Sequence, residues 1–320
     1  MSEIELPRHE EDVKKYLETL NTSQLMMEVM DPWGIGIASS HGDIIRKQLE
    51  ERRHENLENV QRIGGMLMGN HCASKEEEKF ANYHAFRKRM IDRIGKTAYN
   101  LDADLSHYKR LLDDEQARMK NEKTPYLSGE NLNLKLCVPA KENMMIFTGL
   151  KMTDRGVRKV AKRVAHYKSA PAEGLEDPKA IRDYVRNVAS INDWAKIRLV
   201  LMGDESRRER QMGRANIVMR QLDQPHLEYK EKPYPHHKVD IRNTLLEYSP
   251  QDPVSFQVLG IYSFLDDLFG ETCHPIYEQR FANKMYLPGG RIYELTKDEI
   301  RIYNTLAEKA LGFMAGQSSA

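Results

Sequence analysis

Residues 74–121, SKEEEKFANYHAFRKRMIDRIGKTAYNLDADLSHYKRLLDDEQARMKN, carry one continuous apolar pattern. Two series of positions seven residues apart run through this segment, and nine of their twelve members are apolar. One series is His84, Ile91, Ala98, Leu105, Leu112 and Met119, and the other is Phe80, Arg87, Ile94, Leu101, Tyr108 and Glu115. A strict seven-residue repeat of this length predicts one long helix that pairs with another helix along its length.

The ends of the segment carry the signals of a helix start and a helix stop. Ser74 and Glu77 have capping-box spacing, and the acidic run around them suits the positive end of the helix dipole. At about 1.5 Å per residue the helix would be roughly 70 Å long, which exceeds what one compact domain needs. We therefore expect it to pack in a bundle with other helices of this chain, or to pair with a second copy.

Seven of the nine apolar members of the repeat are the residues expected at a contact between copies. They are Ile91, Ile94, Leu101, Leu105, Tyr108, Leu112 and Met119. Two amphipathic helices, at about residues 10–30 and 43–64, precede the segment and offer partners within the chain. The segment from Ile91 to Leu112 is then predicted to pack in this bundle, leaving the end around 115–123 for contact with a second subunit or with the basic domain of the same chain.

The pattern changes after Gly129, where alternating apolar residues predict two strands joined by a short turn, at about 132–138 and 144–147. The sequence therefore predicts two domains, a helical bundle over residues 1–128 and a mixed α and β domain over residues 129–320. The expected fold class is α+β with helices predominating.

Several further elements are expected in the second part. Basic helices begin near Asp154, at Pro178 and near Arg207, and a buried strand spans Ile197 to Met202. The apolar segment from Val254 to Phe269 is expected to be a central helix. Thr296 and Glu299 form a capping box for a last helix over 297–313.

The charge of the chain is unevenly distributed. The net charge of the 320 residues is only +1, but residues 151–223 hold 17 Lys and Arg against 10 Asp and Glu, a net of +7 that leaves −6 for the rest. Such asymmetry favours an anionic partner for the basic part.

The basic helices supply the candidate nucleic-acid-binding residues, since affinity for nucleic acid comes largely from neutralising phosphates. The candidates are Arg155, Arg158, Lys159, Lys162, Arg163, Arg182, Arg186, Arg207, Arg208 and Arg214. They could act together if their helices lie side by side, and Tyr167, Tyr184 and Trp194 could stack on unpaired bases. The alternatives are that these charges face solvent, pair with acidic parts of the chain or a neighbouring subunit, or contact an acidic membrane surface.

The only enzymatic hypothesis concerns Asp204, Glu228 and Lys230. An acidic residue at a strand end and a Glu-x-Lys pair in a nearby extended segment are typical of nucleases that hold Mg²⁺ between carboxylates. Glu-x-Lys is common in charged chains, and a charged edge strand that resists aggregation explains it as well. The chain lacks the Walker A, GxGxxG, GxSxG and HExxH patterns, so we expect no nucleotide or other small-molecule cofactor and no resident metal.

Compartment signals point to a reducing environment inside the cell. Cys72, Cys137 and Cys273 are widely separated and form no CxxC pair. The acidic start of the chain lacks the apolar core of a signal peptide, and no apolar run is long enough to span a bilayer. The function expected from the sequence is that of a non-enzymatic assembly protein that self-associates and binds RNA or another polyanion. The alternatives are the nuclease above and a capsid or scaffold subunit that binds no nucleic acid.

Overall fold

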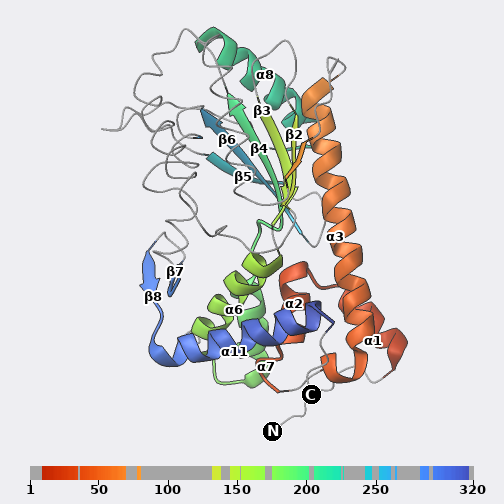
Figure 1. Ribbon diagram of the computed structural model, residues 1–320, viewed down its shortest axis with the longest axis vertical. Helices are drawn as coiled ribbons and strands as arrows, with labels where there is room; N and C mark the ends of the chain where they lie inside the picture. Colours follow the sequence, from red (N-terminus) through yellow and green to blue (C-terminus); the bar gives the residue numbers. More distant parts are fainter. Residues whose placement is uncertain are drawn as a thin grey trace.

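The computed structural model describes residues 9–34, 37–69, 78–80, 132–137, 145–151, 153–169, 175–201, 205–224, 226, 242–246, 252–260, 264, 282–287 and 291–316. Within them a cluster of helices lies at one end of the molecule and a mixed sheet at the other (Figure 1). The α+β class with helices predominating is thus confirmed.

The helical cluster joins segments from both ends of the chain. Its members are α1 (Glu10–Glu18), α2 (Thr22–Met30), the first part of α3 (Ala38–Met68), α6 (Thr153–Ser169), α7 (Pro178–Ala189) and α11 (Lys297–Met314). One apolar core unites them, with α6 central because it packs against α2, α7 and α11. Residues 10–30 form two helices instead of the single one expected, because Asn21 starts α2 with a capping box to Gln24.

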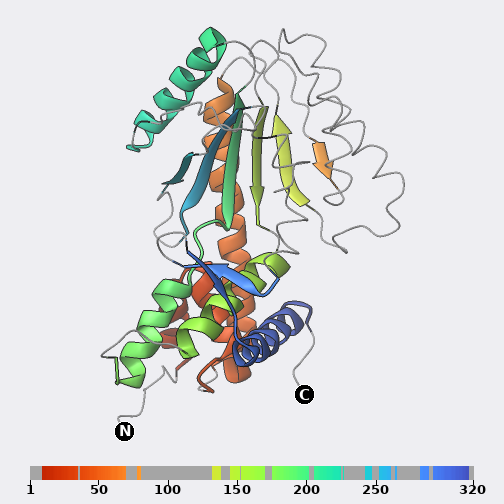
Figure 2. The same ribbon diagram turned by 90° about the vertical axis from the view of Figure 1, so that its left-hand side faces the viewer.

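Helix α3 links the two ends of the molecule (Figures 1 and 2). Its 31 residues extend over about 46 Å at 1.5 Å per residue. Ile45 and Leu49 near its start belong to the helical core, whereas Val60, Ile63 and Leu67 near its end belong to the core beneath the sheet. The helix is kinked at His41, whose backbone angles are not helical.

The sheet has six strands in the order β1-β2-β3-β4-β6-β5. Their bounds are β1 (Glu78–Phe80), β2 (Leu132–Cys137), β3 (Met145–Leu150), β4 (Ala195–Leu201), β5 (Arg242–Leu246) and β6 (Val254–Gly260). Only β4 and β6 are parallel, and the other neighbours are antiparallel. Helix α8 (Glu205–Gln221) follows β4 and packs with α3 on a core that includes Ile197, Leu199, Phe256 and Val258. A separate ribbon pairs β7 (Lys284–Tyr286) with β8 (Ile292–Glu294).

Most of the elements expected after residue 129 are confirmed. Strands β2 and β3 form the antiparallel pair, β4 is the buried strand, and α6, α7 and α8 are the three basic helices. Asp177 caps α7 with Pro178 in its first turn, and Thr296 and Glu299 form the expected capping box of α11.

Two expectations about long helices are wrong where the structure describes them. Val254–Gly260 is the strand β6 between β4 and β5, not part of a helix. A short run of apolar residues does not distinguish a buried strand from a buried helix, and pairing on both sides decided it here. Glu78–Phe80 is the edge strand β1, so no helix runs unbroken from Ser74, and Phe80 is not a helical contact position. The remainder of 74–121, with every residue expected at a contact between copies, lies outside the described residues.

The division of the chain at residue 128 stays a prediction. Described elements from before and after residue 128 pack together in both cores. In the helical cluster α6, α7 and α11 pack with α2, directly or through one another, and α3 packs on β3, β4 and β6 of the sheet.

Candidate nucleic-acid interface

The three basic helices do not form one surface. Helices α6 and α7 pack together in the helical cluster, whereas α8 lies at the far end of the sheet (Figure 1). They also belong to different apolar cores, so the ten candidate residues divide into two groups.

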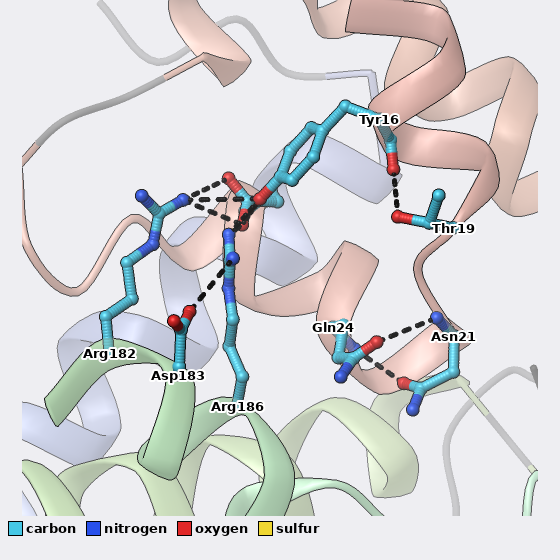
Figure 3. A network of polar contacts seen from close by, with 8 residues as sticks. Tyr16, Thr19, Asn21, Gln24, Arg182, Asp183 and Arg186 are labelled. Carbon is cyan, nitrogen blue, oxygen red and sulfur yellow. Dashed lines mark hydrogen bonds and ion pairs between the residues drawn. The ribbon is translucent and has the colours of Figure 1, made fainter. Parts of the chain in front are cut away.

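The arginines of α7 point into the protein, contrary to the outward face expected for them. Arg182 and Arg186 are only 6% and 9% exposed. Their guanidinium groups converge on the carboxylate of Glu28 in α2 and on the hydroxyl of Tyr16 in α1 (Figure 3). These arginines join three helices and are not available to a ligand at the surface.

The geometry of this cluster is that of a buried, shared ion pair. Arg182 Nη2 lies 3.2 Å and 3.3 Å from the two carboxylate oxygens of Glu28, and Arg186 Nη2 donates to Oε1. Burial raises the pKa of the Tyr16 phenol although both arginines act to lower it. The phenol therefore keeps its proton and donates to Glu28 Oε1 over 3.1 Å. Two cations share one buried carboxylate, so Glu28 is essential to the charge balance here.

The basic residues of α6 have partners within the chain. Arg158 Nε donates to Asp154 Oδ1 at 2.8 Å, and Arg163 donates to the backbone carbonyl of Ser190. Lys162 Nζ lies 5.5 Å from the ring centre of Tyr303, and Arg155 is half-buried. These contacts favour, for α6, the alternative in which the charges serve the fold.

Asp193 forms ion pairs with two lysines, one of which belongs to α6. Its Oδ2 lies 2.7 Å from Lys151 Nζ and 3.1 Å from Lys159 Nζ. Burial acts to raise the pKa of Asp193, but the two ammonium groups outweigh it and hold the pKa well below its usual value of 3.8. Burial lowers the pKa of Lys159, and the positive charge of Lys151 lowers it further, although Asp193 acts to raise it.

We predict that Asp193→Asn destabilises the protein at pH 7 and that the difference from the wild type shrinks in acid. The pKa of Asp193 is lower in the folded protein than in the unfolded chain, so its ionised carboxylate stabilises the fold fully at pH values above the unfolded-state pKa of about 4. This stabilisation is lost progressively as the pH falls from about 4 towards the pKa of the folded state. Urea unfolding at pH 7 and pH 3 checks this. An equal difference at both pH values would contradict the role of the ionised carboxylate.

Of the three basic helices, α8 presents the most exposed arginines. It carries five arginines and two glutamates. Arg207, Arg210 and Arg220 are exposed, and Arg208 and Arg214 are half-exposed. The inward side is apolar, with Met212, Ala215, Val218 and Met219 in the core under the sheet. The arginines are therefore held on a rigid helix whose other face is anchored.

The aromatic residues expected to stack on bases are not on this face. Trp194 is 6% exposed and its indole N–H donates to Ser23 Oγ at 2.7 Å. Tyr167 is 7% exposed and packs edge-on against Tyr184, with 6.0 Å between ring centres. All three belong to or pack on the helical core, so they do not provide a base-stacking platform beside α8.

The residues of the nuclease hypothesis, Asp204, Glu228 and Lys230, lie outside the described residues. Within the described ranges, no group of three or more His, Cys, Asp or Glu is placed to hold a metal ion. The same ranges contain no helix with the length and apolar character of a bilayer span.

A buried histidine and carboxylate pair was not expected from the sequence. His166 Nδ1 lies 2.8 Å from Glu299 Oε1, and the Tyr293 hydroxyl donates to Glu299 Oε2 over 3.0 Å. Burial acts to raise the pKa of Glu299, but bonds from the Thr296 backbone and from His166 outweigh it and lower the pKa. His166, Tyr293 and Glu299 thus join α6, β8 and α11. Of these three residues the sequence pointed only to Glu299, through its place in the capping box of α11.

A surface cavity of about 810 Å³, which no pattern in the sequence indicates, lies between the ends of α2, α3 and α11. Its two basic side chains already face acids: Arg46 lies 3.0 Å from Asp43, and Lys309 lies 3.4 Å from Asp31. The cavity is thus a poorer site for an anion than the face of α8. Comparison with family models, curated proteins and solved structures finds no match to the chain.

Proposed function

We propose that this is a non-enzymatic assembly protein that binds RNA, or another polyanion of similar charge density, through the outward face of α8. The observation that carries the proposal is the set of exposed arginines on an anchored helix, Arg207, Arg210 and Arg220, with Arg208 and Arg214 beside them. Several guanidinium groups on one rigid face neutralise neighbouring phosphates and release their counterions, which is the main source of affinity for nucleic acid.

The division of the basic residues supports α8 over the other two helices. The arginines of α7 are buried on Glu28, and α6 has Asp154 and Asp193 close to its cations. An acid beside a cation weakens the attraction of that cation for a phosphate, and α8 also carries two acids, Glu205 and Glu209, beside its five arginines. The preference for α8 therefore rests on its larger number of exposed arginines. Self-association is the second half of the proposal and rests on the part of the seven-residue repeat that follows β1, from Ile91 to Met119.

The test is a charge-matched pair of triple variants. Replacing Arg207, Arg210 and Arg220 with Gln is expected to weaken binding of a fluorescein-labelled 20-nucleotide RNA by about tenfold or more, and to reduce the slope of log K against log salt by about 2. Fluorescence anisotropy over a salt series measures both quantities.

The control removes the same charge from α6, by replacing Arg158, Lys159 and Lys162 with Gln. We expect a loss of affinity below about threefold, since acids already offset two of these cations. Equal losses from both variants, or no RNA binding by the wild type, would overturn the assignment to α8. Light scattering before and after nuclease treatment tests self-association separately.

A further inference from the structure

Apart from its arginines, the outward face of α8 has few groups that can read a base. The helix, ESRRERQMGRANIVMRQ, contains no aromatic residue. Of its amide side chains, Gln211 is 2% exposed and Asn216 is 9% exposed, and the Asn216 amide lies 3.2 Å from His226 Nε2. Base edges are read by amides and by bidentate arginines, and unpaired bases are bound by aromatic rings. Of the amides and aromatics, only Gln221 is exposed on this helix.

The middle of the face is uncharged over Gly213 and Ile217. Gly213 is exposed with open space around its Cα, and Ile217, one turn further on, is 56% exposed. Exposed Glu209 lies one turn before Gly213. Arg210 and Arg214 lie on one side of Gly213 and Ile217, and Arg220 lies on the other. From Arg207 to Arg220 the helix rises by about 20 Å, so the arginines border a strip along which a polymer backbone can lie.

We infer that α8 binds the phosphodiester backbone of RNA and does not discriminate its bases. This inference rests on the proposed function of the same face and specifies its ligand. The three exposed arginines of this face correspond to about three phosphates neutralised by one copy. On single-stranded RNA this corresponds to a salt slope of about −2 per bound copy.

Backbone recognition can be distinguished from base recognition by exchanging arginine for lysine. A lysine keeps the positive charge but loses the planar, bidentate donor pair that reads guanine. Replacing Arg207, Arg210 and Arg220 with Lys is therefore expected to retain wild-type affinity within about threefold, whereas the corresponding Gln variant loses about tenfold or more. Circular dichroism verifies that both variants keep their helix content.

The probes are labelled 20-nucleotide poly(U), poly(A) and a mixed sequence, with inorganic polyphosphate as the competitor. We expect affinities within about threefold of each other, equal salt slopes and displacement by polyphosphate. Ile217→Ser should leave binding unchanged. A preference for one sequence above tenfold, loss of binding in the Lys variant, or a loss in Ile217→Ser equal to that of the Gln variant would overturn backbone recognition while leaving RNA binding intact. Binding to none of the probes would instead overturn the proposed function.

Discussion

Glu28→Gln is expected to lower the free energy of unfolding by about 3 to 5 kcal/mol, the usual cost of removing one partner from a buried ion pair. Glu28 is 7% exposed, and its carboxylate is shared by Arg182 and Arg186, which are buried to a similar extent. Glutamine keeps the shape of the side chain but removes the charge that balances both guanidinium groups. Urea unfolding followed by circular dichroism at pH 7 measures the loss.

A triple variant separates the charge imbalance from the loss of packing. The triple variant replaces each of Glu28, Arg182 and Arg186 with Met. It removes all three charges of this buried cluster and fills a similar volume. Because apolar replacements of buried ion pairs are often neutral, we expect the triple variant to be more stable than Glu28→Met alone. If Glu28→Met were the more stable of the two, the cluster would not be held by its shared carboxylate.

Gly156→Ala is expected to cost about 3 kcal/mol, at the upper end of the range for overpacked cores. Gly156 is a buried residue of α6, and a Cβ there would overlap the six-membered ring of Trp194. The indole cannot easily move aside, because it is 6% exposed and its N–H donates to Ser23 Oγ. Glycine is required at this position for close approach and not for an unusual backbone angle.

Two variants test that explanation by thermal and urea unfolding. Gly213→Ala in α8 places a methyl group where nothing lies within 4 Å, so it should stabilise the protein by about 0.5 to 1 kcal/mol through helix propensity. Trp194→Leu removes the overlapping ring, so adding Gly156→Ala to it should cost about 1 kcal/mol or less. An undiminished cost in the Leu background would rule out the ring contact as the cause.

The sequence alone was sufficient where the signal is local. Thr296 with Glu299, and Pro178, marked the starts of α11 and α7, because the residues that start a helix are its immediate neighbours in the chain. The alternation around 132–147 predicted the pairing of β2 with β3, since a short turn leaves few other partners. The arginines after Arg207 were also visible in the sequence as part of a basic helix.

Tertiary structure decided the rest, because the relevant partners are far apart in sequence. The strand Val254–Gly260 was set by β4 and β5 on its two sides, not by its own apolar pattern. The sequence pattern places Arg182 and Arg186 on the surface of their helix. In the structure they are buried because they bind Glu28, which lies more than 150 positions away in the chain. The sequence thus determined which helices are basic, but only the packing determined which of them serves the fold and which faces outward, since burial and pairing depend on contacts that no local pattern encodes.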